Sequence, residues 1–234
     1  MLDLLAFGSS GWGDELLSGA AMTLAVAVSA FLLGLVFGAA GAAAKLSYSL
    51  TLRALAEVYT TAVRGVPELL VIYLLFFGGG TMVQAVAGLF GHEGFIQLNA
   101  FTIGVVAVGL ISGAYSTEVI RGAVQSVPHG QIEAARACGM GRWLILVRIL
   151  APQTLRFALP GLGNVWQLTL KDTSLISVTA LAEIMRVAHV ASGSTRQPFL
   201  FYATAAVLYL LLTTLSTLVF ERAEQRAMRG VRRA

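Results

Sequence analysis

The chain has 234 residues, of which 57% are hydrophobic and only 12% charged, and its mean hydropathy is +0.79. Soluble domains carry about 25% charged residues, so this composition excludes an ordinary soluble fold and predicts an all-α integral membrane protein. The length suits one transmembrane domain covering 1–234, because a helix needs about 20 apolar residues to span a bilayer. The single cysteine, Cys138, excludes an intrachain disulfide.

The first predicted span covers about 16–44, a stretch that contains no charged residue. The residues before it include Asp3, Asp14 and Glu15 but no basic cluster, so we expect a retained span and not a cleaved signal peptide. Gly34 and Gly38 have the G-x-x-x-G spacing, which allows another helix to approach closely. We expect this approach within the bundle, in preference to a contact between copies of the chain.

The second predicted span covers about 54–80. Its uncharged part, 69–77, is too short to cross a bilayer alone, so the helix should begin before Arg64 and kink at Pro67. The three glycines at 78–80 should close it. The apolar sequence at 83–90 then predicts a short interfacial helix.

The remaining spans are predicted at about 100–119, 157–178 and 199–220, with a polar loop at about 122–152 between the third and fourth. The fourth span is interrupted by charge. If it is one continuous helix, Lys171 and Asp172 lie at membrane depth.

The basic residues predict the orientation of these five spans, because the loops rich in Lys and Arg stay in the cytoplasm. The first and third links and the tail hold two, five and five of the 16 basic residues: Lys45, Arg53; Arg121, Arg136, Arg142, Arg148, Arg156; Arg222, Arg226, Arg229, Arg232, Arg233. We therefore expect a periplasmic N-terminus and a cytoplasmic C-terminus. This distribution explains the net charge of +4 without nucleic acid as a partner.

No residue pattern predicts catalysis or metal binding. The phosphate-binding pattern G-x-x-x-x-G-K-[ST] is absent, because Lys45 and Lys171 are followed by Leu46 and Asp172. The histidines fall on three different links, which favours loop positions over a shared site: His92, His129, His189. We therefore expect that this chain holds no cofactor and does not hydrolyse ATP itself.

The loop between the third and fourth spans contains a recognisable pattern. Glu133-Ala134-Ala135 is followed by Gly139, then by Ile149 and Pro152. This spacing resembles the EAA loop of bacterial ABC-importer permeases, with Ala151 where that family has Leu. The flanking sequences at 64–70, 113–140 and 171–177 resemble the polar-amino-acid branch of the family. Within it, the chain looks most like the first permease subunit of histidine/lysine/arginine/ornithine importers, and opine importers are close relatives.

The resemblance implies a type I importer permease with a cytoplasmic coupling helix, in the bacterial inner membrane. Its partners would be two ATP-binding cassette subunits, a second homologous permease and a periplasmic substrate-binding protein. The cargo would be a polar amino acid, with basic ones favoured (histidine, arginine, lysine, ornithine) and an opine such as octopine or nopaline as the alternative. Six residues would contact or support contact with the ATPase: Glu133, Ala134, Ala135, Gly139, Ile149, Pro152.

Polar and charged residues within the spans form the candidate substrate path: Arg64, Glu68, Glu118, Lys171, Asp172, Thr173, Ser174. Charges are costly in lipid, so these groups should face the bundle interior or a wet cavity. They could recognise cargo or pair with one another. We favour the structural interpretation for Arg64 and Glu118, and both interpretations stay open for 171–174. Adjacent residues on a helix do not face one direction, so Lys171 and Asp172 should have different partners.

Two other classes of function remain to be weighed. An ion-coupled secondary transporter more typically shows an internal repeat over ten or more spans, and this sequence shows neither. A non-transporting membrane scaffold or channel subunit would need no ATPase subunit as a partner. Binding of ATPase subunits would separate that interpretation from a permease.

Overall fold

The computed structural model describes residues 2–8, 11–89, 99–179 and 181–228, and every regular element in these ranges is a helix. Five segments are long and apolar enough to cross a membrane, as predicted. The elements are η1 (Leu2–Leu5), α1 (Gly13–Lys45), α2 (Leu50–Gly65), α3 (Glu68–Leu89), α4 (Ala100–Gln125), α5 (His129–Ala137), α6 (Arg142–Ile145), η2 (Leu146–Leu150), α7 (Ala151–Asp172), η3 (Thr173–Thr179), α8 (Ile184–Thr195) and α9 (Pro198–Ala227). The predicted loop position of His92 lies outside the described residues.

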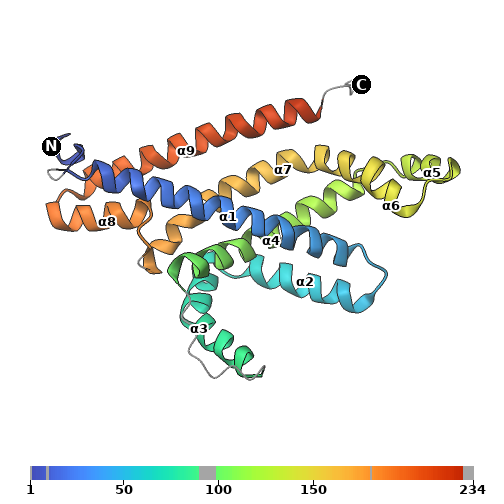
Figure 1. Ribbon diagram of the computed structural model, residues 1–234, viewed down its shortest axis with the longest axis horizontal. Coiled ribbons are helices and arrows are strands. Elements are labelled where there is room, and N and C mark those ends of the chain that lie inside the picture. The colour runs from blue at the N-terminus through green and yellow to red at the C-terminus, as the bar shows by residue number, and fades with distance from the viewer. Residues whose placement is uncertain (1, 9–10, 90–98, 180, 229–234) are drawn as a thin grey trace.

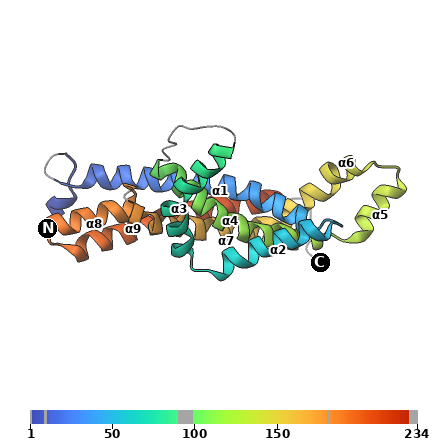
Figure 2. The same cartoon turned by 90° about the horizontal axis from the view of Figure 1, so that it is seen from below.

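Four long helices, α1, α4, α7 and α9, run along the long axis of the molecule (Figures 1 and 2). The N-terminus and α8 lie at one end. The link between α1 and α2 lies at the other end, together with α5 and α6. Helix α3 leaves the bundle at a steep angle (Figure 1). The bundle thus has two polar ends that are joined by apolar helices.

Small residues bring α1 and α4 into close contact. A Cβ atom added to Gly34 or Gly38 would lie 2.6 Å from Ser112 Oγ or 2.5 Å from Ser116 Cβ, both in α4. Both distances are shorter than a real Cβ contact, so a side chain would push the helices apart. The G-x-x-x-G pair therefore packs within the bundle, as expected. Beside it, Phe31 and Trp166 meet edge to face in a cluster that joins α1 to α7.

The prediction for the second span was wrong about where the spanning helix begins and ends. The chain breaks after Gly65, where Val66 is extended (φ −110°, ψ 140°). A residue before proline disfavours the helical conformation, so Pro67 separates two helices instead of kinking one. Helix α3 starts at Glu68, continues through the glycines at 78–80 and ends at Leu89. It also contains 83–89, so the described part of the predicted interfacial helix belongs to the span itself.

The fourth span consists of two kinds of helix. Helix α7 ends at Asp172, and the chain continues as the 3₁₀ helix η3. Thr173 and Ser174 donate hydroxyl hydrogen bonds to the carbonyls of Leu170 and Lys171, both at 2.7 Å. The charged pair therefore stands at a helix end, and the predicted single helix over 157–178 is replaced by a change of helix type.

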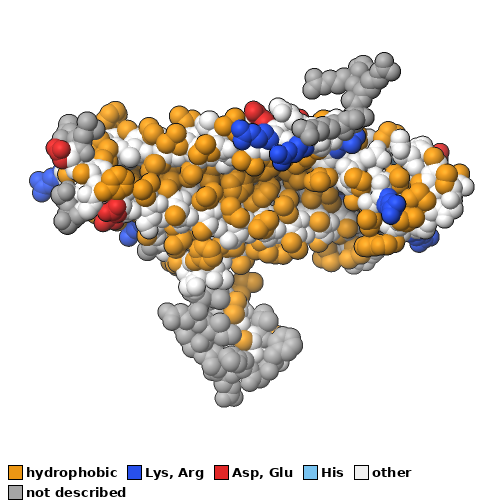
Figure 3. Space-filling view, turned by 45° about the horizontal axis from the view of Figure 1, so that its top comes forward, with side chains coloured by type: hydrophobic (Ala, Val, Ile, Leu, Met, Phe, Trp, Pro, Cys, Tyr) orange, Lys and Arg blue, Asp and Glu red, His pale blue; other side chains and the backbone are white. Residues whose placement is uncertain are grey.

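The outer surface of the bundle is largely apolar, as expected for a protein surrounded by lipid. Hydrophobic side chains cover much of the long face in Figure 3. The exposed hydrophobic residues of the bundle include Leu210 and Leu215 of α9. Near the end that carries α5, Arg156 Nε donates a 2.8 Å hydrogen bond to the carbonyl of Ala227, which ties α7 to the last turn of α9. The two helices are therefore fixed to each other at this end.

The packing of α1 against α4 predicts opposite effects of two Gly→Ala substitutions. Gly38→Ala should destabilise the protein by roughly 1–3 kcal/mol, because the new methyl group overlaps Ser116. Gly122→Ala in α4 meets no atom within 4 Å, so it should be neutral or stabilise by about 0.5–1 kcal/mol. Thermal unfolding of both variants in detergent measures the difference. Equal midpoints would contradict the close contact.

Candidate functional site

Residues from three helices meet where the second span breaks. Tyr115 of α4 donates a 3.2 Å hydrogen bond to Glu68 at the start of α3. The guanidinium carbon of Arg64, in the last turn of α2, lies 5.4 Å from the centre of the Tyr115 ring. Asp172, at the end of α7, is close enough to interact electrostatically with Glu68 and Tyr115. We call Arg64, Glu68, Tyr115 and Asp172 the central charge site.

The carboxylates of the central charge site outnumber its cationic groups. Within the described residues, neither Glu68 nor Asp172 has a basic nitrogen within 4.0 Å. Two carboxylates that face each other in a medium of low dielectric repel, and a bound cationic group would relieve this repulsion. Arg64 is exposed and can also meet a carboxylate. The arrangement suits a small molecule that carries an ammonium or guanidinium group and a carboxylate.

The predicted substrate path divides into four groups, of which Glu118 is described separately below. Arg64, Glu68 and Asp172 belong to the central charge site. Lys171 is exposed and faces a separate cavity with Ser174, between α7, α8 and α9. Thr173 is fully buried. The expectation that Lys171 and Asp172 have different surroundings is thus met, and the sequence analysis missed Tyr115, whose place opposite the break at Pro67 only the fold reveals.

Glu118 belongs to a separate ionic cluster nearer the end that carries α5. Lys45, at the end of α1, pairs with Glu118 of α4 and with Glu57 of α2, the latter at 2.8 Å. Arg121 also pairs with Glu118, at 2.8 Å. The Lys45 side chain is only 6% exposed, so its charge depends on these carboxylates. The cluster ties α1, α2 and α4 together, which supports the structural interpretation of Glu118.

A hydroxyl group also holds α2 against the bundle. The Tyr59 hydroxyl donates a 2.6 Å hydrogen bond to the carbonyl of Leu110 in α4. Burial raises the pKa of Tyr59 to about 12, so the donor stays protonated at physiological pH. Helix α2, and Arg64 in its last turn, are therefore fixed relative to α4.

The loop predicted to contact an ATPase folds as a short helix that ends in a sharp turn. In α5, Glu133 and Ala134 are exposed, whereas Ala135 is buried. The amides of Gly139 and Met140 donate to the carbonyls of Arg136 (2.9 Å) and Ala135 (3.1 Å). This is a Schellman motif, and Gly139 adopts the left-handed φ of +75° that the motif requires. The glycine thus ends α5 and turns the chain back towards the bundle.

The return path from α5 to α7 contains a π-helical turn. Ile149 lies in this turn, η2, and Pro152 is near the first residue of α7. Proline has no N–H for the carbonyl four residues earlier, and π turns are common at functional sites. The Gln153 side chain donates to the carbonyl of Ile149 at 3.1 Å. The chain from α5 therefore reaches Asp172 through a π turn followed by α7, a continuous helix that contains Pro160.

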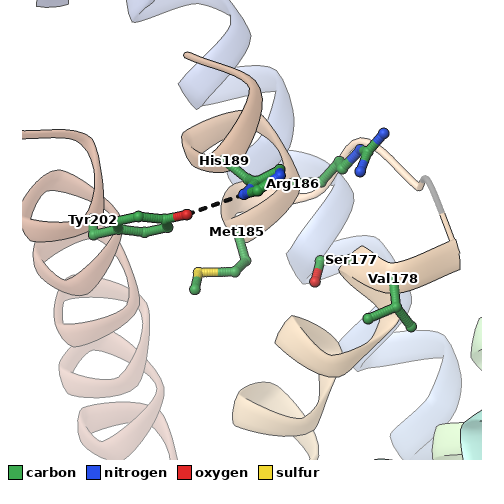
Figure 4. Close-up of a pocket in the computed structure, with 6 residues that line it drawn as sticks. All are labelled: Ser177, Val178, Met185, Arg186, His189 and Tyr202. Atoms are coloured by element: carbon green, nitrogen blue, oxygen red, sulfur yellow. Dashed lines mark hydrogen bonds between the residues drawn. The ribbon is translucent and has the colours of Figure 1, made fainter. Parts of the chain in front are cut away.

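A further pocket of about 230 Å³ lies at the opposite end, between η3, α8 and α9 (Figure 4). Tyr202 of α9 points across it to His189 of α8, and the two side chains form a hydrogen bond of 3.0 Å. Arg186 lies at its edge in Figure 4. This pocket shares no residue with the central charge site.

The comparison with known proteins identifies the family. A family model described as the inner membrane component of binding-protein-dependent transport systems matches residues 30–229. The chain belongs to this family. It is 60% identical to the nopaline transport system permease protein NocQ of Agrobacterium fabrum, over 99% of this chain and 98% of that protein. It is 40% identical to the histidine/lysine/arginine/ornithine transport system permease protein HisQ of Escherichia coli, over 96% and 98%.

Solved structures show the same fold. The crystal structure of an amino acid ABC transporter with histidines contains a chain that is 31% identical to this one, with a TM-score of 0.77 and coverage of 92% and 95%. The MetNI methionine ABC transporter in an inward-facing conformation gives a TM-score of 0.75 at 16% identity, over 93% and 98% of the two chains. The predicted resemblance and the type I ABC permease fold are confirmed. As a family member, the chain is a transport permease and not a catalytic subunit.

The ionic cluster predicts unequal effects of two neutralising substitutions in this permease. Lys45→Met should destabilise it by roughly 2–4 kcal/mol, because Glu118 loses a buried partner. Glu57→Gln should cost about 0–1 kcal/mol, because Glu57 is 67% exposed. The unfolding midpoint of each purified variant tests this. Similar losses in the two variants would show that Lys45 is not the centre of the cluster.

Proposed function

We propose that the chain is a permease subunit of a bacterial ATP-driven importer for polar amino acids, with basic amino acids as the favoured cargo. The observation that carries this proposal is the central charge site. There Glu68 and Asp172 are close enough to interact electrostatically, neither forms an ion pair among the described residues, and Arg64 lies nearby. The carboxylates would hold the cationic side chain or the ammonium group of the cargo. Arg64 would hold its carboxylate. Similarity to permeases named for histidine, lysine, arginine and ornithine supports this assignment.

An opine is the second candidate cargo. The permease named for nopaline is 60% identical to this chain, and permeases named for octopine are 56–57% identical. The central charge site carries both signs of charge, so it suits any cargo that has cationic and carboxylate groups.

The importer would contain a second homologous permease, two ATP-binding cassette subunits and a periplasmic substrate-binding protein. ATP and Mg²⁺ would bind to the cassette subunits. The basic residues of the two links and the tail support an inner-membrane orientation with the N-terminus in the periplasm and the C-terminus in the cytoplasm. In that orientation α5 lies in the cytoplasm and α8 in the periplasm. An ion-coupled transporter or a scaffold would not require the α5 loop to meet an ATPase.

Alternating access would be driven through α5. Glu133 and Ala134 would seat on an ATPase subunit, and Ala135 and Gly139 would give the loop its shape. Movement of α5 would pass through Ile149 and Pro152 in and beside the π turn to α7, which ends at Asp172. Helix α7 has 22 residues and spans about 33 Å at 1.5 Å per residue. The loop and the cargo site would therefore be linked by a single rigid element.

The coupling role predicts that Glu133→Arg reduces ATP-dependent uptake at least about tenfold while the permease still inserts into the membrane, since a lost charged contact is worth roughly that factor. Gln131→Arg is the control, because it introduces the same cationic side chain at another exposed position of α5 without removing a carboxylate. Uptake by proteoliposomes that contain the full complex and binding protein measures both variants. Normal uptake by Glu133→Arg would contradict the coupling role.

The cargo role predicts that Asp172→Asn and Glu68→Gln each raise the cargo concentration for half-maximal ATPase stimulation about tenfold, because each removes one charge-assisted contact. Lys171→Gln is the comparison variant, because its side chain lines another cavity and its electrostatic effect on Asp172 is smaller than that of Glu68. The ATPase activity of the reconstituted complex is measured while binding protein loaded with cargo is titrated. If the Lys171 variant is affected and the two carboxylate variants are not, the central charge site is not the cargo site.

A further inference from the structure

A buried carboxylate stands apart from both the cargo site and the coupling loop. Glu183 precedes α8, and it is 0% exposed. Its carboxylate accepts hydrogen bonds from the amides of Met185 (2.8 Å) and Arg186 (2.7 Å), which cap the helix. It also accepts a hydrogen bond from the hydroxyl of Tyr209 in α9, at 2.9 Å. The two amide bonds already cap α8, so the bond to Tyr209 calls for a separate explanation.

The Tyr209 hydroxyl joins four elements. It donates to Glu183 at the start of α8, and it also lies near the hydroxyl of Thr23 in α1. Thr23 in turn accepts a 3.2 Å hydrogen bond from the amide of Ile184, which closes a ring of polar groups. On its remaining side, the Tyr209 hydroxyl lies 3.4 Å from the hydroxyl of Thr173 in η3. The ring is therefore in contact with the residue at which α7 gives way to η3.

Thr173 defines the end of α7. It is fully buried, and its hydroxyl donates to the carbonyl of Leu170 at 2.7 Å. Asp172 is the residue immediately before it. Asp172 is the last residue of α7, so its side chain keeps the direction that the α-helix gives it only if the helix ends at this position.

We propose that Glu183 and Tyr209 are positioning residues that fix the end of α7 and thereby hold Asp172 opposite Glu68. Glu183 orients the Tyr209 hydroxyl, and Tyr209 packs against Thr173. This inference rests on the proposed cargo role of Asp172, but the fixed end of α7 is a property that can be measured without cargo.

Tyr209→Phe separates this role from a simple helix cap. The substitution removes one hydroxyl, leaves the two amide bonds of Glu183 intact and keeps the aromatic ring. If Glu183 serves only to cap α8, the change should leave residues 170–179 as they are. Tyr202→Phe is the matched control on the same helix, because the Tyr202 ring lines a cavity with Tyr209 but its hydroxyl bonds His189 (Figure 4).

The experiment measures amide hydrogen exchange over 170–179 in the assembled transporter without cargo, and then the cargo concentration for half-maximal ATPase stimulation. In Tyr209→Phe we expect exchange about tenfold faster and a similar rise in that concentration, because a hydrogen bond to a charged group is lost. Tyr202→Phe should match the wild type in both. Wild-type exchange and wild-type stimulation in Tyr209→Phe would overturn the proposal.

Two further variants distinguish failure of the positioning proposal from failure of the cargo assignment. Thr173→Val removes both the hydroxyl that faces Tyr209 and its bond to the Leu170 carbonyl, so it should accelerate exchange at least as much as Tyr209→Phe. Unchanged exchange in Thr173→Val would also overturn the proposal. If Asp172→Asn leaves cargo stimulation unchanged while Tyr209→Phe accelerates exchange, the cargo assignment fails and the positioning of the helix end stands.

Discussion

The rest of this structure depends on one constraint, the free-energy cost of placing charged side chains in an apolar environment. Lipid offers no compensation for a buried charge, so each charged side chain of the bundle needs a partner within the protein or a ligand. Lys45 meets this need with Glu57 and Glu118. Glu183 meets it with two amides and a tyrosine hydroxyl. Glu68 has only the Tyr115 hydroxyl, and neither Glu68 nor Asp172 forms an ion pair among the described residues, so these two carboxylates differ from the ones with structural partners.

The arrangement of the helices gives the two functional regions a mechanical connection. The α1–α4 contact, made close by glycines and serines, forms the fixed part of the bundle. Helix α7 packs on α4 and runs from the π turn to Asp172. A displacement of α5 would therefore be taken up at η2 and passed along α7. The Thr173 hydroxyl, which follows the end of α7, bonds the carbonyl of Leu170 and lies 3.4 Å from the hydroxyl of Tyr209, so Asp172, the carboxylate that we propose to hold cargo, stands beside these contacts.

Much of this could be predicted from the sequence. The number of spans followed from apolar length, and the family followed from Glu133-Ala134-Ala135 and Gly139, whose turn requires glycine. The break before Pro67 was mistaken for a kink, because the local effect of proline does not show whether a helix resumes at once or after an extended residue. Tyr115 was missed because an aromatic residue in an apolar helix gives no sign of its partner across the bundle.

The partners of Glu118 and Glu183 were also beyond sequence reasoning. Glu118 lies 73 positions from Lys45 in the chain, and Glu183 lies 26 positions from Tyr209. Such pairs depend on the helix packing, which periodicity alone does not define. The sequence showed that charged residues within apolar segments need partners or ligands. The fold then showed which of these residues form ion pairs and which do not.

The central claim is that a cargo with a cationic group binds at Glu68 and Asp172 and is moved by ATP hydrolysis on partner subunits. The most direct measurement is the ATPase activity of the reconstituted transporter with binding protein, screened over basic amino acids, neutral amino acids and opines. The account predicts stimulation by at least one basic amino acid or opine and none by neutral amino acids. Cargo uptake that proceeds without ATP hydrolysis, or equal stimulation by neutral amino acids, would contradict it.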